Sequence, residues 1–283
     1  MIVIGRNVNY KQFAGESYFS SVSDAKSAIK KNSSNAYVVI DLAYTSVPNT
    51  SYDDPVKDFS ENLNNVINHL LFVEEIGAEK YIYVSSGGTV YGNVNADIIT
   101  EDASNFPLSP YGITKMACER YVHLYNKTHN IFTCILRPSN VYGPGQKPFR
   151  GQGFIATALG LAYKNLPVTI YGTGSQVRDN IFIDDFCRGV FDVIEYGENG
   201  GIYNVSEGKG MSNLEVLNNI QQLVKGDLIE LEKKYLPERK FDVQKNVLDY
   251  SRLSALNNWR PEISFEEGLK KTALWIKQFL NEH

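Results

Sequence analysis

The sequence has few cysteines, no long basic run and no long apolar run. Cys118, Cys134 and Cys187 are too few and too widely spaced for a disulfide framework or a zinc site, so we expect reduced and mostly buried thiols and no metal. The longest nearly apolar stretch, Phe154 to Tyr163, is far too short to cross a bilayer. With a net charge of −4 and no basic patch, the chain is not expected to bind nucleic acid or a membrane.

A secretory signal is also missing. The N-terminal residues MIVIGRNVNYK do not show a charged start followed by an apolar core and a cleavage site, so we expect a cytoplasmic protein. The 283 residues, 43% hydrophobic and 21% charged, are typical of a folded globular chain. This length suits one large α/β domain, or a large domain with a smaller partner.

Short apolar runs alternate with helical patterns through the first two thirds of the chain. This alternation is typical of βαβ units and a parallel sheet. The expected strands are continuous apolar runs, as in strands covered on both faces, and lie at 36–43, 81–86 and 131–138. Helices are predicted at 60–76, ended by Gly77, and at 111–129. The predicted fold class is therefore α/β, with a doubly wound, Rossmann-like parallel sheet.

The rest of the chain is less regular. Residues 140–153 are rich in glycine and proline and are predicted to form a loop. Further elements are expected in a helix at 154–164, strands at 168–172 and 178–183, a helix opened by Asp184 or Asp185, and a final helix with a capping box of Ser264 and Glu267. We expect a doubly wound domain at 1–139 plus about 176–200, and a smaller interleaved lobe at 140–175 and 201–283.

Small hydroxyl residues and glycines follow the strand at 81–86, in YVSSGGTVYG (83–92). Ligands of open α/β sheets bind at the carboxyl ends of the strands, so Ser85, Ser86 and Thr89 are placed to meet a ligand. Gly87 and Gly88 would let the backbone approach it closely. The alternative is a glycine-rich turn in which the serines only bond the backbone.

Tyr111 and Lys115 lie four residues apart in SPYGITK (109–115) and so share one face of the predicted helix. An ammonium near a phenol favours the phenolate and lowers the phenol's pKa, which suits proton transfer near neutral pH. Alone, the spacing is more typical of a surface pair at a helix start. The pair lies between the strand that ends in hydroxyl residues and RPSNVYGPG (137–145), and this position favours the acid–base interpretation.

Five motifs occur together in a fixed order: SSGGTVYG, SPYGITK, RPSNVYGPG, GTGSQVRDNIFIDD and NNWRPEISFEEGL. With VIDLAY and Asn62 before them, they resemble the extended short-chain dehydrogenase/reductase family, in its nucleotide-sugar epimerase and dehydratase branch. The resemblance covers nearly the whole chain from Val38 onward. It implies NAD as cofactor, a nucleotide sugar as substrate and a homodimer formed through the helices at about 60–77 and 111–129. It also implies that the doubly wound domain is the dinucleotide-binding domain and that the smaller lobe is the substrate-binding lobe.

The resemblance also implies residue roles. Tyr111 would be the catalytic base and acid, and Lys115 would hold the nicotinamide ribose. The residues expected to line the dinucleotide are Leu42, Ala43, Asn62, Ser85, Ser86, Pro138 and Ser139. Those expected at the nucleotide sugar are Asn140, Gln152 and Tyr171, with Arg178 and Arg239 as a guanidinium clamp on the pyrophosphate. For Arg178 the alternative is a salt bridge to Asp179 or Asp184, and Asp184 and Asp185 are interpreted as a helix N-cap.

Family dehydratases carry an Asp–Glu pair after the catalytic hydroxyl, where this chain has Gly88 and Thr89, so a 4,6-dehydratase is disfavoured. A 4-epimerase needs only the Tyr–Lys pair, a hydroxyl and bound NAD. The expected function is epimerisation of a UDP-hexose or UDP-N-acetylhexosamine at C4 through a 4-keto sugar. The alternatives are an NAD(P)-dependent reductase and a non-catalytic UDP-sugar-binding remnant.

Two departures from the family pattern matter. The catalytic hydroxyl residue maps onto Gly87. We expect Thr89 to substitute, because it points to the same side as residue 87 if the strand is still extended, and Ser86 is adjacent. The glycine-rich loop that holds the pyrophosphate is also missing: Gly5, Val8 and Lys11 stand in its place if Ile2–Gly5 is the first strand. We favour Ile2–Gly5 as the second strand, with the first lying before Met1 and residues 17–31 forming the third strand and its helix. Arg6 would then reach the adenosine ribose, where it would suit the 2′-phosphate of NADP.

Overall fold

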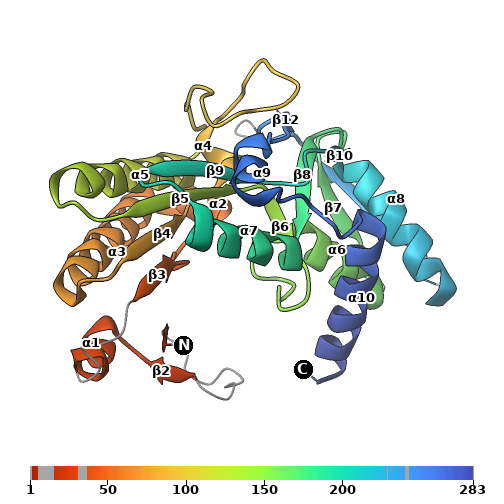
Figure 1. Cartoon of the computed structure of the whole chain (residues 1–283). Helices are drawn as coiled ribbons and strands as arrows, with labels where there is room; N and C mark the ends of the chain where they lie inside the picture. Colours follow the sequence, from red (N-terminus) through yellow and green to blue (C-terminus); the bar gives the residue numbers. More distant parts are fainter. Residues whose placement is uncertain (1, 6–15, 31–36, 228, 240–241, 283) are drawn as a thin grey trace.

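The computed structural model describes residues 2–5, 16–30, 37–227, 229–239 and 242–282 (Figure 1). Its main sheet is parallel, with the strand order β3 (Val38–Asp41), β4 (Lys80–Val84), β5 (Thr133–Pro138) and β9 (Gly201–Val205). The predicted strands at 36–43, 81–86 and 131–138 are thus confirmed with shorter bounds. Parallel strands need crossover connections, and here helices supply them.

Helices cover both faces of this sheet, because successive residues of each strand point to opposite sides. Tyr81 and Tyr83 pack against α3 (Pro55–Ile76) and α5 (Pro110–Thr128). Ile82, between them, packs on the other face against α7 (Ile183–Tyr196) and α9 (Ser251–Asn257). The doubly wound sheet is therefore confirmed.

Local signals fix the ends of these helices. Gly77 ends α3 in the left-handed conformation, as predicted, with φ 61°. The helix starts earlier than predicted because Asp54 accepts a hydrogen bond from the Lys57 amide (2.9 Å) and Pro55 takes the first position. For α7 the expected cap is wrong: Phe182 is the N-cap, and the Asp185 carboxylate instead accepts from the Ile263 amide at 3.0 Å.

The second lobe contains two small sheets. β7 (Val168–Tyr171) pairs with β11 (Lys233–Leu236), and β8 (Val177–Phe182) pairs with β6 (Asn140–Tyr142), β10 (Gly210–Ser212) and β12 (Lys245–Asn246). The helices that enclose its apolar core are α6 (Phe154–Tyr163), α8 (Asn213–Val224) and α10 (Phe265–Glu282). In Figure 1 this lobe lies beside the carboxyl end of the main sheet.

Two strands cross the predicted domain limits. β9, expected in the lobe at 201–283, belongs to the main sheet, because it pairs with β5 along its whole length. β8, expected in the dinucleotide-binding domain at about 176–200, pairs only with lobe strands among the described residues. The division into a dinucleotide-binding domain and a substrate-binding lobe stays a proposal, with these two strands exchanged.

The N-terminal residues form a separate unit. β1 (Ile2–Ile4) pairs in parallel with β2 (Ser17–Phe19), and α1 (Val22–Lys30) packs through Ala25 and Ile29 on Phe72 of α3. Within the described chain no strand pairs with the outer edge of β3, where Val38 and Ile40 are 38% and 40% exposed. Ile2–Gly5 is therefore not the strand beside β3. Its pairing with β2 agrees with the interpretation of the two as second and third strands.

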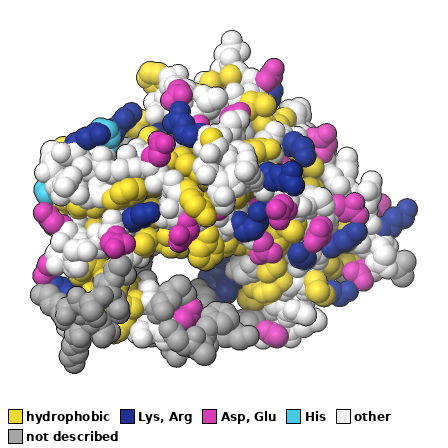
Figure 2. Space-filling model, viewed as in Figure 1, with side chains coloured by type: hydrophobic (Ala, Val, Ile, Leu, Met, Phe, Trp, Pro, Cys, Tyr) yellow, Lys and Arg dark blue, Asp and Glu magenta, His cyan; other side chains and the backbone are white. Residues whose placement is uncertain are grey.

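Hydrophobic side chains gather across the middle of the face that Figure 2 shows. Val8, Lys11 and Arg6 lie outside the described residues. Among the helices that are described, none combines the length and the apolar character that a membrane span requires. Cys118 and Cys134 are buried as expected, whereas Cys187 is exposed.

Candidate active site

The side chains of Tyr111 and Lys115 are both buried. Ser109 caps the start of α5 by accepting a hydrogen bond from the Gly112 amide at 3.1 Å, and Pro110 takes the first helical position. Tyr111 and Lys115 follow on the face turned toward the sheet, and are 8% and 4% exposed. Lys115 Nζ donates to the carbonyl oxygen of Val84, the last residue of β4, at 2.9 Å. The interpretation of a surface pair is therefore wrong.

Aromatic rings surround the Lys115 ammonium. Its Nζ lies 4.0 Å from the ring centroid of Tyr44, 5.1 Å from that of Tyr83 and 5.9 Å from that of Tyr111. Burial lowers the pKa of Lys115 to about 8, although nearby acidic groups oppose the shift.

The pKa of Tyr111 does not follow the simple expectation. Burial raises it above its ordinary value, and the charge of Asp58 raises it further. The expectation of a lowered pKa for this phenol is therefore wrong, because burial and Asp58 dominate while the Lys115 ammonium is directed at Val84 and Tyr44.

Asn62 lies on α3 and is 1% exposed. Its side-chain oxygen accepts from the Thr45 amide at 2.8 Å, and its side-chain nitrogen donates to the Asp58 carbonyl at 2.8 Å. The Asp58 carboxylate in turn accepts from the Thr114 hydroxyl at 2.6 Å, which ties α3 to α5. These bonds fix the loop after β3. Leu42 on that loop is 65% exposed, so its side chain is accessible to a ligand.

The hydroxyl-rich segment turns sharply after β4. The strand ends at Val84, and α4 (Gly87–Val90) follows. The argument that Thr89 points with residue 87 along an extended strand is therefore wrong, since these residues are helical. Thr89 Oγ1 approaches the Ser86 carbonyl at 3.5 Å.

Ser86 lies beside Gly88. A Cβ built on Gly88 would be 3.4 Å from Asn140 Oδ1 and 4.0 Å from Ser86 Oγ, so both side chains border the space in front of Gly88. Ser85 Oγ is buried and has no hydrogen-bond partner among the described residues. Burying a hydroxyl without a hydrogen-bond partner costs free energy, and a bound ligand that supplies the hydrogen bond would remove this cost. Pro138, the last residue of β5, and Ser139 after it are also buried and lie next to this turn.

Gly87 has no room for a side chain. A Cβ there would stand 2.8 Å from the Arg137 carbonyl and 3.1 Å from the Pro138 carbonyl, and would also meet the Leu248 side chain. The packing around Gly87 therefore excludes the hydroxyl side chain that the family carries at this position.

We expect Gly87→Ser to lower the free energy of unfolding by about 1–3 kcal/mol without raising turnover, because the backbone must shift to admit the new side chain. Urea denaturation measures the first effect. Gly88→Ser is the matched control, since its Cβ meets only ordinary contacts and should leave the urea midpoint nearly unchanged. Equal midpoints for both variants would contradict the packing argument.

The predicted substrate residues lie in the lobe. Arg239 stacks on Tyr171, with Cζ 3.5 Å from the ring centroid, and its Nη1 donates to Asn49 Oδ1 of α2 (Pro48–Asp53) at 3.0 Å. This contact joins the lobe to the loop region after β3. Asn140 and Gln152 are exposed, and Asn140 is the first residue of β6.

Arg178 is half-buried on β8. Its Nη1 donates to the neighbouring Val177 carbonyl at 2.9 Å, and within the described ranges it forms no salt bridge. The alternative of a bridge to Asp179 or Asp184 is therefore wrong: the Asp179 carboxylate accepts instead from the amides of Glu207 (2.9 Å) and Gly208 (3.0 Å). Burial lowers the pKa of Arg178, so an anion beside this guanidinium would stabilise its charge.

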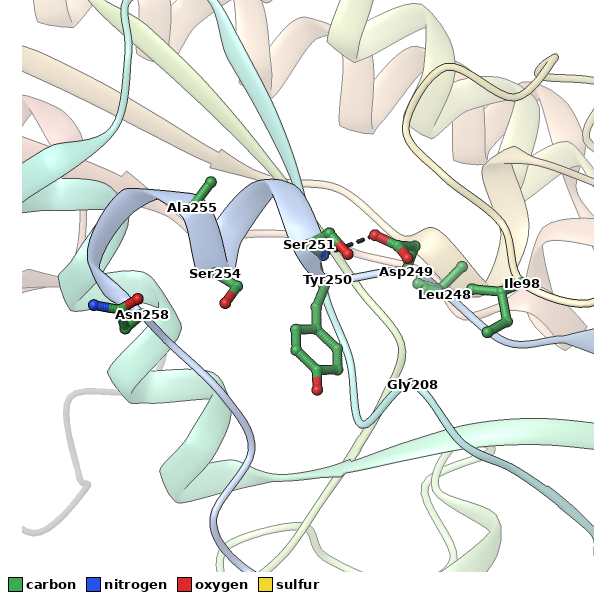
Figure 3. A pocket seen from close by; sticks show the side chains of 9 residues that line it. All are labelled: Ile98, Gly208, Leu248, Asp249, Tyr250, Ser251, Ser254, Ala255 and Asn258. Carbon is green, nitrogen blue, oxygen red and sulfur yellow. Dashed lines mark hydrogen bonds between the residues drawn. The ribbon is translucent and has the colours of Figure 1, made fainter.

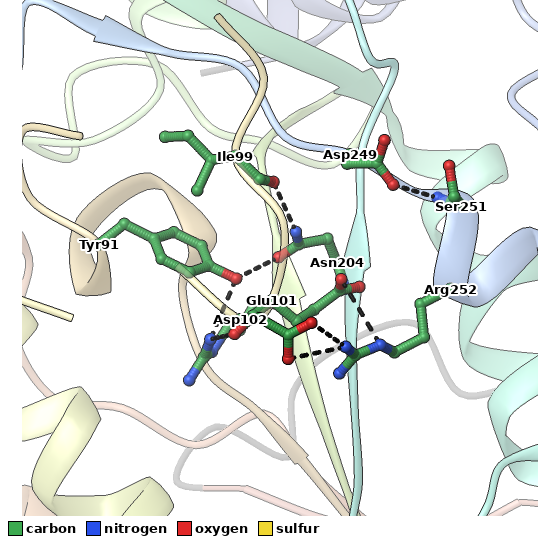
Figure 4. Close-up of polar contacts among 9 residues, drawn as sticks. Tyr91, Ile99, Glu101, Asp102, Asn204, Asp249, Ser251 and Arg252 are labelled. Atoms are coloured by element: carbon green, nitrogen blue, oxygen red, sulfur yellow. Dashed lines mark hydrogen bonds and ion pairs between the residues drawn. The ribbon is translucent and has the colours of Figure 1, made fainter. Parts of the chain in front are cut away.

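A buried polar network lies behind the site, and the sequence did not point to it. Arg137 of β5 forms two hydrogen bonds to Glu119 of α5, at 3.0 and 2.6 Å, and a third to the Tyr91 hydroxyl at 3.0 Å. Figure 4 shows Tyr91 bonded onward to Asn204 of β9, at 2.7 Å. The network fixes α5, and with it Lys115 one turn before Glu119, against the sheet.

A separate pocket of about 490 Å³ lies near α9 (Figure 3). It is lined by Ile98, Gly208, Leu248, Asp249, Tyr250, Ser251, Ser254, Ala255 and Asn258. Neither Tyr111 nor Lys115 lines it. The Asp249 carboxylate accepts from the Ser251 amide at 2.7 Å and so completes a turn. We assign this pocket no part in the chemistry.

Comparison with known proteins identifies relatives along nearly the whole chain. The model of the NAD dependent epimerase/dehydratase family matches residues 6–206. A putative UDP-glucose 4-epimerase of Methanocaldococcus jannaschii is 33% identical over 250 residues, which are 88% of this chain and 79% of that protein. Among solved structures, UDP-glucose 4-epimerase of Thermotoga maritima with UDP-glucose superposes with a TM-score of 0.89 at 27% identity, over 99% of this chain and 91% of that one. The UDP-glucose 4-epimerase of Thermus thermophilus in complex with NAD gives 0.87 at 29% identity, over 98% and 90%.

Proposed function

Because the chain belongs to the NAD dependent epimerase/dehydratase family, we propose that it epimerises a nucleotide sugar at C4 with NAD. The observation that carries the proposal is the buried Tyr111–Lys115 pair at the carboxyl end of β4. The relatives named UDP-glucose 4-epimerase support a UDP-hexose or UDP-N-acetylhexosamine as substrate.

The residues at the carboxyl ends of β3, β4 and β5 suit a dinucleotide. The Ser85 hydroxyl is buried and needs a partner, Leu42 is exposed, and Lys115 has N–H groups beyond the one bonded to Val84. Ala43, Asn62, Ser86, Pro138 and Ser139 would complete the lining. These residues would hold NAD, and the bound cofactor would supply the reversible transfer of hydride from and to C4 of the sugar.

Tyr111 would move the proton. Its phenolate oxygen takes the proton of the sugar 4-hydroxyl as C4 becomes a carbonyl, and the phenol gives the proton back when C4 is reduced. No net proton or reductant is consumed. Lys115 stabilises the phenolate through its positive charge, which opposes the effect of burial. Ser86 or Thr89 would hydrogen-bond the 4-oxygen, and Ser86 is favoured because its hydroxyl, like the Asn140 side chain, borders the space in front of Gly88, whereas the Thr89 hydroxyl approaches the Ser86 carbonyl.

Arg178 and Arg239 would hold the diphosphate, and Asn140, Gln152 and Tyr171 would face the nucleotide sugar. We expect Arg178→Gln to weaken UDP-sugar binding by about 10- to 100-fold, the size of a charge-assisted hydrogen bond to a half-buried cation. Calorimetry measures the dissociation constant. Arg260→Gln, at an exposed arginine, should leave it unchanged. The same affinity for the wild type and Arg178→Gln would remove Arg178 from the diphosphate site.

The function itself is tested by incubating the protein and NAD with single UDP-sugars and following the anomeric protons by NMR. Interconversion of C4 epimers without added reductant is expected. Stoichiometric consumption of NADPH would instead identify the reductase. UDP-sugar binding with neither NAD binding nor turnover would identify a non-catalytic binding protein.

We also propose a cytoplasmic homodimer formed through α3 and α5. Leu71 of α3 and Leu124 of α5 are 48% and 47% exposed, and their burial against a second copy would stabilise the pair. Sedimentation of the wild type as a monomer would exclude this assembly.

A further inference from the structure

Tyr44 lies in the loop after β3, against both Tyr111 and Lys115. Its ring centroid is 4.8 Å from that of Tyr111 at an interplanar angle of 65°, an edge-to-face contact. The Lys115 ammonium stands over the ring face at 4.0 Å. The Tyr44 hydroxyl approaches the Tyr111 carbonyl at 3.5 Å. One side chain therefore contacts both members of the acid–base pair.

Apart from the Tyr44 ring, few groups replace the hydration that the Lys115 ammonium loses on burial. It donates one hydrogen bond, to Val84, and within the described chain it forms no salt bridge. The rings of Tyr83 and Tyr111 lie farther away than that of Tyr44. A cation over an aromatic face is stabilised by the ring's electron density, most strongly where water is excluded.

We propose that Tyr44 is a positioning residue whose ring face holds the Lys115 ammonium charged and aims its remaining N–H groups away from the protein, toward the cofactor ribose. The ring, not the hydroxyl, supplies this effect. The consequence for turnover rests on the proposed function. The effect on Lys115 itself does not, because it follows from contacts made without any ligand.

Other groups also act on Lys115 and must stay constant in a test. The acidic and titratable groups around it come from every element packed there: Asp41 of β3, Asp58 of α3, Tyr83 of β4, and Tyr111, Cys118 and Glu119 of α5. None of them is altered by a substitution at position 44. A change in the ionisation of Lys115 in such a variant therefore reports on the ring.

The experiment compares wild type, Tyr44→Phe and Tyr44→Leu. Competitive acetylation of the full chain with acetic anhydride across pH 6–10, read by mass spectrometry on the Lys115 peptide, gives the pKa of Lys115. Loss of the ring disfavours the ammonium, so Tyr44→Leu should lower this pKa by about one unit, and Tyr44→Phe should restore the wild-type value. Circular dichroism checks the fold, and Tyr44→Met serves as a second ringless variant.

Turnover gives the independent readout. Because the ammonium form is the active one, kcat/KM falls as pH rises through the pKa of Lys115. In Tyr44→Leu this fall should begin about one unit lower, a roughly tenfold loss near pH 9 with little loss near pH 6. The same Lys115 pKa in wild type, Tyr44→Phe and the ringless variants would overturn the proposal. An inactive wild type with a shifted pKa in Tyr44→Leu would overturn the proposed function alone.

Discussion

Tyr111→Phe should lower kcat by about 1000-fold, which is within the range that a positioned general acid–base group contributes. The ring stays, so the edge-to-face contact with Tyr44 and the packing of α5 are preserved. Only the proton carrier is lost. Substrate affinity should change little, because the proposed diphosphate contacts come from Arg178 and Arg239. NMR of the epimer ratio over time gives kcat, and calorimetry gives the affinity.

Tyr196→Phe, at a tyrosine of α7 that is 52% exposed, is the matched control and should retain wild-type kcat. A Tyr111→Phe variant with more than about a tenth of wild-type kcat would assign the proton transfer to another group. Ser86 and Thr89 would then be the next candidates, since both lie at the turn after β4.

The second large effect concerns stability. Arg137 and Glu119 are 2% and 4% exposed and are joined by two hydrogen bonds. Glu119→Gln leaves the guanidinium buried without its counter-charge, so we expect a loss of about 3–5 kcal/mol in the free energy of unfolding. Glu61→Gln, the same change in the exposed Lys57–Glu61 pair of α3, should cost less than about 1 kcal/mol.

Urea denaturation of both variants measures these differences. Replacing both partners, as in Glu119→Leu with Arg137→Met, removes both charges together and should recover part of the lost stability. If Glu119→Gln were as stable as Glu61→Gln, the pair would contribute no more than a surface contact.

Local patterns make much of the fold predictable from the sequence. Apolar runs identify β3, β4 and β5, and Gly77 identifies the end of α3, because these signals depend on neighbours along the chain. Tyr111 and Lys115 can be placed on one helix face for the same reason. The exchange of β8 and β9 between the sheets cannot be foreseen, since strand pairing depends on contacts between distant segments.

The errors at the site have similar causes. The expectation for Thr89 assumes that the strand continues, whereas the chain turns into α4. The raised pKa of Tyr111 follows from burial and from Asp58, which lies on a different helix far earlier in the chain. Tyr44 and the Arg137–Glu119 pair carry no local motif at all. Their contacts can be recognised only in the folded structure, where β3, α3, α5 and β5 pack together.

The side chain of Arg239 is held in place before any ligand arrives. Its guanidinium lies on the Tyr171 ring and donates to Asn49, so its long side chain is restrained at its far end. An unrestrained arginine loses about 2 kcal/mol of rotamer entropy when it is immobilised. Here most of that loss accompanies folding, so an anion bound at this guanidinium keeps more of its interaction energy as affinity.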